Sequence, residues 1–431
     1  MGIQEEFRLN MERKLVKDYG NIIKKYAPEH PLAARRMINA GLALEQFRTR
    51  YLADRRIPSA YRYLNTFAVG EVLAALRQPQ QSVWTNIFSP VEILQCFDVH
   101  SLSVECLSSF LSGFMIEDYF LDYAENEGIA PTLCSYHKNF IGAVDSGVIA
   151  PPAFAVTTST ICDGNVNTFR YLADRYQVPD YLLDIPDCYS PEAEVYVAEQ
   201  LRELIARLEE TFGKKMDYGR LSAVLERENE SKESYRRTLS MMRTKAYPST
   251  LTLQMYMLFA NHLNIGTPKI LAFYKKMEAE VAAAPEFDGV NVFWVHLLPW
   301  YQETLQSYFN GSDRYQIQGI EMSLDYMEPL DAAHPLEALA KKMINNIYTG
   351  SYERKADMIR DVVKEIQPDG VINFCHWGCK QSSGGAVILK EKMQEIGMPF
   401  LILDGDGMDR RNSHDGQIQT RFEAFLEMIQ K

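Results

Sequence analysis

Cysteines on three separate elements of the chain are candidates for one shared site. Cys375 and Cys379 lie in the stretch Asp369–Lys380, which begins as an apolar strand and continues into a short loop. Cys134 and Cys162 lie in two other loops, far away in the sequence. Ligands of α/β proteins bind where strands end, so these loops can present their thiols to one ligand. The simpler alternative is a set of unconnected buried thiols.

The remaining cysteines indicate a chain without structural disulfides. Seven cysteines form an odd, scattered set in a chain of 431 residues, and the first residues carry no apolar leader. Disulfides are rare in large chains of this kind. We expect Cys96, Cys106 and Cys188 to be inert, buried core thiols.

Charge and hydropathy exclude two classes of partner. The net charge is -12 and the basic residues are dispersed, so the chain lacks the basic surface that nucleic acids require. Apolar runs stay shorter than the 18 residues that suggest a membrane span. We predict a cytoplasmic protein that binds neither nucleic acid nor membrane.

The elements that must position the thiols form four segments. Residues 1–83 show helical spacing, 84–205 form a first α/β domain carrying Cys134 and Cys162, 206–285 are helical, and 286–431 form a second α/β domain carrying Cys379. We predict that the cysteine loops meet in a cleft between the two α/β domains. The predicted strands cover residues 99–104, 154–158, 181–186, 290–297, 316–321, 370–374 and 400–403. The predicted helices cover residues 5–26, 31–55, 60–78, 90–96, 114–127, 165–176, 192–212, 218–242, 251–262, 335–347, 352–366, 386–396 and 416–429.

Several segments in register carry a resemblance to a known family. They are Trp84–Glu105, Leu133–Tyr136, Ile161–Asp163, Asp369–Lys380 and Asp404–Asn412. From residue 84 to the end, the chain resembles the 2-hydroxyacyl-CoA dehydratase and benzoyl-CoA reductase family, specifically the D component of 2-hydroxyglutaryl-CoA dehydratase. The resemblance implies an α/β fold with two Rossmann-like or flavodoxin-like parallel-sheet domains, a helical N-terminal segment and a helical middle segment.

The resemblance implies that Cys134, Cys162 and Cys379 bind a [4Fe-4S] cluster. Three thiolates leave one of the four irons open for a substrate. Cys375 is an alternative or additional ligand, because it precedes Cys379 by four residues. Zinc is the competing metal, since His137 and His376 lie near the proposed ligands. The lack of a closely spaced cysteine pair argues against zinc, and we expect His376 to lie beside the cluster without binding iron.

The resemblance also implies catalytic residues near the cluster. Glu105 matches a glutamate of the dehydratases and is a candidate acid or base, although a carboxylate at a helix start is an equally good interpretation. Ile87 stands where the dehydratases have a serine beside the open iron. Thr85 and Asn86 are candidates to supply the missing hydrogen bond.

The implied reaction is the radical dehydration of a 2-hydroxyacyl-CoA to a 2-enoyl-CoA. In this family, an ATP-dependent [4Fe-4S] activator protein injects one electron, and a ketyl radical forms. The implied partners are the acyl-CoA substrate and a homologous second subunit in a heterodimer, or a second copy in a homodimer. One alternative is a benzoyl-CoA-reductase-like enzyme, or a reductase with a double-cubane [8Fe-9S] cluster built with Cys106, Cys188 and Cys375. Another is an electron-relay or structural subunit of a heterodimer.

Charged residues near these motifs allow further interpretations. We interpret the acidic stretch Asp404–Asp409 as a structural loop rather than a divalent-metal site, with Arg410 and Arg411 capping charges or facing a phosphate. Lys138 and Arg170 follow cluster cysteines. They are candidates to contact CoA phosphates or to lower thiolate pKa values.

Overall fold

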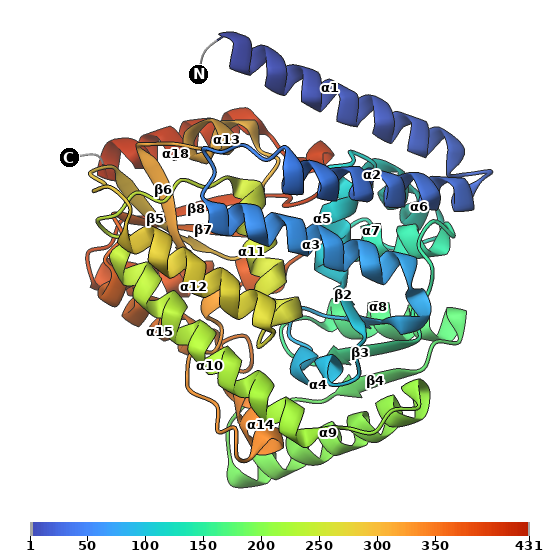
Figure 1. Ribbon diagram of the computed structural model, residues 1–431. Helices are drawn as coiled ribbons and strands as arrows, with labels where there is room; N and C mark the ends of the chain where they lie inside the picture. The colour runs from blue at the N-terminus through green and yellow to red at the C-terminus, as the bar shows by residue number, and fades with distance from the viewer. Residues whose placement is uncertain (1–2, 430–431) are drawn as a thin grey trace.

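Two parallel four-stranded sheets form the centre of the protein. The computed structural model describes residues 3–429, and its two sheets lie side by side with helices around them (Figure 1). The first sheet contains β1 (Ser82–Thr85), β2 (His100–Ser103), β3 (Phe154–Thr158) and β4 (Asp180–Leu183). The second contains β5 (Val290–Val295), β6 (Tyr315–Ile320), β7 (Gly370–His376) and β8 (Phe400–Gly405). The predicted α/β fold with two parallel sheets is confirmed.

Both sheets have the same topology. The strand orders are β2-β1-β3-β4 and β6-β5-β7-β8, and every pair is parallel. In each sheet the second strand lies on one side of the first strand, and the third and fourth strands lie on its other side. The point at which the strand order reverses, the topological switch point, is therefore between β1 and β3 in the first sheet and between β5 and β7 in the second. Ligands of such sheets bind beyond the carboxyl ends of the strands at this point.

Apolar and β-branched residues explain the strands. All five residues of β3 and all six of β5 are buried, as expected for parallel strands with helices on both faces. The strand β1 was not predicted, although it is central in its sheet. Its four residues, Ser-Val-Trp-Thr, are too few to show a pattern.

Helices cover the sheets, and several begin at clear capping signals. Ser190 caps the helix that starts with Pro191, and Thr267 caps the one that starts with Pro268. The helices are α1 (Ile3–Tyr26), α2 (Pro31–Tyr51), α3 (Ser59–Arg77), α4 (Val91–Gln95), α5 (Val104–Gly113), α6 (Glu117–Asn126), α7 (Ser135–Asp145), α8 (Asp163–Tyr176), α9 (Pro191–Phe212), α10 (Tyr218–Met241), α11 (Leu251–Asn264), α12 (Pro268–Ala282), α13 (Glu303–Phe309), α14 (Pro335–Asn345), α15 (Tyr352–Ile366), α16 (Lys380–Ser383), α17 (Ala386–Glu395) and α18 (Asp415–Ile429). Short 3₁₀ turns lie at Pro79–Gln81, Glu321–Leu324 and Arg410–Asn412.

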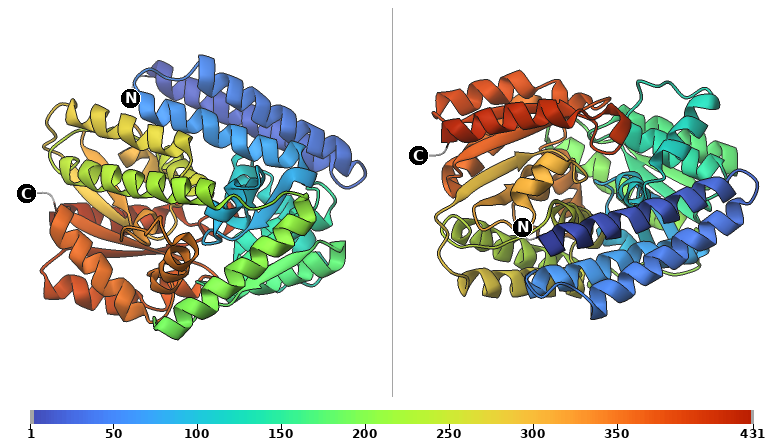
Figure 2. Two further views of the ribbon diagram at one scale, coloured as in Figure 1. Left: turned by 60° about the horizontal axis from the view of Figure 1, so that its bottom comes forward. Right: turned by 90° about the horizontal axis from the view of Figure 1, so that it is seen from above.

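Two sets of helices join the halves of the molecule. The helix α3 packs against β1 and β2 of the first sheet and against α11 and α12 beside the second. On the opposite side, α9 packs against β4 and against α14 of the second half (Figure 2). The two sheets are therefore held at fixed positions from both sides. Within residues 3–429, each helix is too short or too polar to cross a lipid bilayer.

The helix that carries Glu105 was not predicted. The predicted helix over residues 114–127 matches α6 (Glu117–Asn126), but the sequence prediction missed α5, which begins at Val104 because the Ser103 side chain accepts a hydrogen bond from the Cys106 backbone N–H. Met115, with φ of 57°, then turns the chain before α6 begins at Glu117. The correction matters because it places Glu105 in the first turn of a helix that directly follows β2.

Candidate functional site between the two sheets

The three predicted thiols come together between the two sheets. Cys134 precedes α7, Cys162 follows β3 and precedes α8, and Cys379 follows β7 and precedes α16. Burial raises the pKa of the Cys134 thiol, and the charges of Cys379 and Cys162 raise it further. Burial also raises the pKa of Cys162 to about 11, and Cys379 contributes to that shift. The charge of Cys379 contributes to the shift at both Cys134 and Cys162, which indicates that the three thiols lie in the same part of the structure.

The loops that carry these thiols approach each other very closely. Gly378 has φ of 79°, and a Cβ at this position would lie 2.7 Å from the backbone nitrogen of Cys134. Only glycine fits both this conformation and this space. Ile161, directly before Cys162, has φ of 73°, which is a genuine outlier for a β-branched residue. Such strain persists where the surrounding structure enforces it, which is common at functional sites.

A histidine ring lies against each thiol. The Nε2 atom of His376 is 3.2 Å from Cys134 Sγ, that of His296 is 3.5 Å from Cys379 Sγ, and that of His137 is 3.7 Å from Cys162 Sγ. Burial lowers the pKa of His137 to about 4 and lowers the pKa values of the other two rings. The sequence indicated His137 and His376, but it missed His296. Its position directly after the strand β5 was the available signal.

The donor chemistry of the site fits a multi-iron cluster with three thiolate ligands. Over residues 3–429, no three or more Cys, His, Asp or Glu side chains converge closely enough to bind one metal ion. Cysteine thiolates are the ligands that iron–sulfur clusters use, so three thiols on three loops are a suitable donor set for such a group. Burial raises the pKa of Cys134 and Cys162, so metal binding to these two sulfurs would release a proton from each.

Among the other cysteines, Cys375 has a pKa raised to about 11, mainly by burial and in small part by the charge of Cys379. Cys375 is next to His376 in β7, so their side chains point to opposite faces of the sheet. The Cys375 thiol donates to the Ser382 carbonyl oxygen at 3.2 Å. Cys96 and Cys106 are buried as predicted, whereas Cys188 is exposed in the loop before α9. The prediction of a buried Cys188 was wrong because this loop lies on the surface.

Glu105 is a buried carboxyl group beside Cys162. It lies in the first turn of α5, is 9% exposed, and its Oε2 atom has no hydrogen-bond partner among the described residues. Burial raises the pKa of Glu105 to about 7, while polar groups of Asn165, Ser103 and the Ile87 backbone oppose part of the shift. Its charge in turn raises the pKa of Cys162. A carboxyl group with this pKa can both donate and accept a proton near neutral pH.

Thr85, the last residue of β1, and the two residues after it differ in whether their side chains already have hydrogen-bond partners. The Asn86 amide donates to Thr158 Oγ1 at 3.0 Å and accepts from Ser89 Oγ at 2.6 Å, so its side chain is engaged in holding the loop. The Thr85 hydroxyl is buried and lacks a hydrogen-bond partner within the described part of the chain. Ile87 is 2% exposed and lines a small cavity of about 30 Å³ between the two halves.

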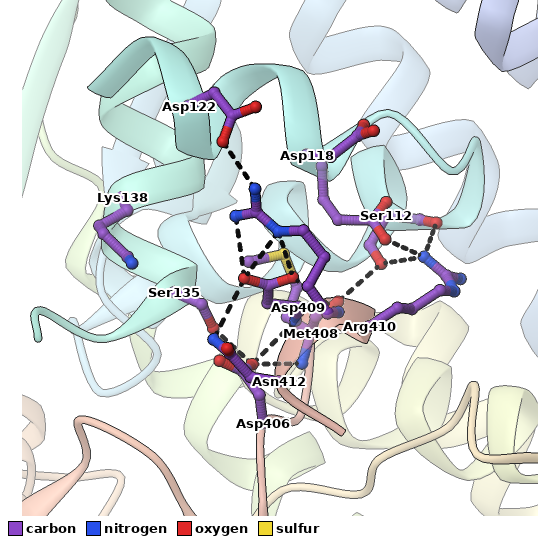
Figure 3. A network of polar contacts seen from close by, with 12 residues as sticks. Ser112, Asp118, Asp122, Ser135, Lys138, Asp406, Met408, Asp409, Arg410 and Asn412 are labelled. Atoms are coloured by element: carbon purple, nitrogen blue, oxygen red, sulfur yellow. Dashed lines mark hydrogen bonds and ion pairs between the residues drawn. The ribbon is translucent and has the colours of Figure 1, made fainter. Parts of the chain in front are cut away.

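The acidic loop after β8 fastens the site to the first half of the protein. One carboxylate oxygen of Asp406 accepts hydrogen bonds from Ser135 Oγ at 2.6 Å and from the backbone N–H groups of Met408 and Asp409 (Figure 3). Arg411 pairs with Asp409 and Asp122, and Arg410 pairs with Glu117. The loop is therefore structural in this conformation, because its arginines contact carboxylates.

Lys138 also has a structural role. Its ammonium group donates to Glu125 Oε1 at 2.6 Å and to the Pro131 carbonyl oxygen at 2.8 Å, and the side chain is buried. The interpretation of Lys138 as a phosphate-binding residue was therefore wrong, because these bonds hold the loop that leads to Cys134. Arg170 is exposed on α8.

The fold and the thiols define an α/β protein in which two doubly wound sheets face a shared cysteine site. The sequence model of 2-hydroxyglutaryl-CoA dehydratase, D-component, matches residues 86–429, so the chain belongs to this family. The (R)-phenyllactyl-CoA dehydratase alpha subunit of Clostridium sporogenes is 24% identical over 340 residues, covering 72% of this chain and 79% of that subunit. The lactoyl-CoA dehydratase subunit alpha of Anaerotignum propionicum is 24% identical over 355 residues, covering 72% and 81%. A benzoyl-CoA reductase subunit of Thauera aromatica is 21% identical over 391 residues, covering 78% and 86%.

Proposed function

We propose that this chain is the alpha-type subunit of a 2-hydroxyacyl-CoA dehydratase that works in the cytoplasm. The reaction removes the 2-hydroxyl group and a β-proton as water and leaves a 2-enoyl-CoA. The observation that carries the proposal is the grouping of Cys134, Cys162 and Cys379 beside a buried Glu105, in a chain of the dehydratase family. These thiols are the proposed ligands of a [4Fe-4S] cluster.

The cluster, when bound, supplies a low-potential electron and an open iron that acts as a Lewis acid. The residues of the chain bind and orient the substrate and move its protons. Glu105, with a pKa of about 7, donates a proton to the leaving hydroxyl group or accepts the β-proton. The Thr85 hydroxyl is positioned to donate a hydrogen bond in the same buried region. Burial of both groups keeps bulk water away from the reacting atoms.

The proposal includes two protein partners. The similar dehydratase chains are named as alpha subunits, which supports a homologous second subunit for this chain. Radical dehydration also requires an electron donor, and we propose an ATP-dependent activator protein with its own [4Fe-4S] cluster. An electron-relay or structural role for this chain is less well supported, because it retains the buried Glu105.

Reduction of an acyl-CoA is the second candidate function. Ile87 supports it, because an apolar side chain occupies the position of the serine that the dehydratases place beside the open iron. The similarity to a chain of benzoyl-CoA reductase points in the same direction. A larger double-cubane cluster has less support, since Cys188 is exposed on the surface and the Cys375 thiol already bonds to the Ser382 carbonyl oxygen.

Anaerobic reconstitution with iron and sulfide tests the cluster. We expect Fe–S absorbance and about four irons per chain, whereas a double cubane would give about eight. Cys134→Ser, Cys162→Ser and Cys379→Ser should each lose most of the iron, and Cys188→Ser, at an exposed thiol, should retain it. Absence of Fe–S absorbance in the wild type, or full iron content in the three variants, would contradict the proposal.

Activity assays separate the two candidate reactions. The reconstituted chain, its partner subunit, activator, ATP and a reductant are incubated with a 2-hydroxyacyl-CoA or with an aryl-CoA. Formation of the 2-enoyl-CoA without net consumption of reductant supports dehydration. Reductant consumed in proportion to product supports the reductase.

A further inference from the structure

The proton on the His376 ring has a fixed position. The backbone N–H of Gly407 donates to His376 Nδ1 at 2.9 Å, so this nitrogen carries a lone pair and the ring proton must be on Nε2. Asp406 Oδ1 lies 3.7 Å from Nδ1, which is beyond hydrogen-bond distance. The Nε2 atom, 3.2 Å from Cys134 Sγ, therefore presents its N–H to the sulfur.

The same argument applies to His296. The backbone N–H of Leu297 donates to His296 Nδ1 at 2.8 Å, which again leaves the proton on Nε2. That nitrogen is 3.5 Å from Cys379 Sγ, within the range of an N–H···S hydrogen bond. His137 differs, because its Nδ1 partner is the Thr168 hydroxyl, which can donate or accept.

Buried groups also hold the backbone of both histidines in place. The backbone N–H of His296 donates to Glu321 Oε2 at 3.1 Å, and Tyr348 OH donates to the same oxygen at 2.7 Å. Lys355, 1% exposed, pairs with the other oxygen of Glu321 at 2.9 Å. These bonds hold His296 at a φ of 75°, a conformation that is uncommon for a residue other than glycine. The backbone N–H of His376 donates to Ser382 Oγ at 2.9 Å.

We propose that His376 and His296 are positioning residues that donate N–H···S hydrogen bonds to the thiolates of Cys134 and Cys379. They thereby raise the reduction potential of the bound cluster. The inference rests on the proposed cluster and goes beyond it, because it assigns a role to two residues that bind no iron. A donor beside a ligand sulfur stabilises negative charge, and the reduced cluster carries one more negative charge than the oxidised one. Both donors belong to the second half of the protein, so that half controls the potential.

A redox titration of the reconstituted protein, monitored by EPR, tests this role. We expect His376→Leu and His296→Leu to retain about four irons per chain and to shift the midpoint potential to more negative values. His376→Gln is the matched control, because its side-chain amide can donate an N–H in place of Nε2, and its potential should stay closer to that of the wild type. His262→Leu replaces a buried histidine whose Nδ1 bonds to the Leu258 carbonyl oxygen and should leave the potential unchanged.

Pulsed EPR in D₂O provides a second test, and its first step uses only the wild-type protein. Exchangeable deuterons of the two Nε2 groups should couple to the reduced wild-type cluster, and one coupling should disappear in each leucine variant. Unchanged potentials in the iron-loaded leucine variants, or the absence of such couplings in the wild type, would overturn the inference while leaving the proposed function intact. A wild-type chain that binds no cluster would overturn both.

Discussion

The two sheets share one strand order, but the ends of their central strands carry different chemistry. In the first half, β3 leads to Cys162, and the helices α5 and α7 begin near Glu105 and Cys134. In the second half, β5 leads to His296, and β7 ends in His376 and leads to Cys379. The first half supplies two thiols and a buried carboxyl group with a raised pKa, whereas the second supplies one thiol and two histidine rings. The topology determines where the site lies, and the loops determine what each half contributes.

The largest effect is expected from the proton-transfer group of the first half. Glu105→Gln keeps the shape of the side chain but removes its acid–base function, so activity should fall about 10²- to 10⁴-fold while iron content is retained. Steady-state assays and iron analysis measure both quantities. Glu117→Gln is the control, because Glu117 is also buried in the first turn of a helix but pairs with Arg410. Equal losses in both variants would show that burial of a carboxyl, and not its position, explains the effect.

The pH dependence of stability gives a second effect in the first half. The pKa of Glu105 is raised from 4.5 to about 7 on folding, so the folded state holds the proton more tightly than the unfolded state. The resulting stabilisation is complete below pH 4.5 and is lost as the pH rises through 7. The stability of Glu105→Gln minus that of the wild type should therefore be about 3 kcal/mol larger at pH 8 than at pH 4. Denaturant unfolding of both proteins at the two pH values measures this change, and a constant difference would contradict it.

A smaller effect is expected at the junction between the halves. Asp406→Asn removes the negative charge that accepts three hydrogen bonds, including the one from Ser135, and should cost about 2 kcal/mol of stability. Asp404→Asn is the control two residues earlier, at the end of β8, because Asp404 is exposed and pairs with Arg421 on the surface. Its cost should be below about 1 kcal/mol. Similar costs for both variants would mean that Asp406 does not join the halves.

The smallest effect is expected at Cys375, in the second half. Its thiol lies on the face of β7 opposite His376 and bonds to the Ser382 carbonyl oxygen, which a serine hydroxyl can also do. Cys375→Ser should therefore keep its iron, in contrast to Cys379→Ser. Iron analysis after reconstitution compares the two variants, and iron loss in Cys375→Ser would make Cys375 a ligand.

Much of this arrangement could be predicted because parallel strands impose it. Runs such as those of β3 and β7 indicated buried strands, and loops after such strands were expected to meet. This rule applies to Cys162 and Cys379, which follow β3 and β7, whereas Cys134 lies between the helices α6 and α7 and was included because of the family resemblance. The short strand β1 and the start of α5 escaped prediction, since four residues show no period and the Ser103 cap was not recognised.

The environments of individual side chains could not be predicted in the same way. The pKa of Glu105 depends on the residues that bury it and bond to it, and these residues come from several elements of the fold. Lys138 looked available to a ligand until the structure placed Glu125 beside it. The exposure of Cys188 and the direction of the His296 ring likewise depend on tertiary packing, on which local sequence carries no information.

The dispersion of the proposed ligands has a consequence for the biosynthesis of the protein. The three proposed ligands, Cys134, Cys162 and Cys379, lie on three separate loops. No short segment of the sequence contains two of them at a spacing that would bind a metal ion. For the proposed cluster, a nascent chain therefore offers no local binding site, and its iron would enter only after both sheets have formed and Gly378 has reached the Cys134 backbone. Cys162 and Cys379 remain partly exposed in the folded chain, which leaves a route for this late maturation step.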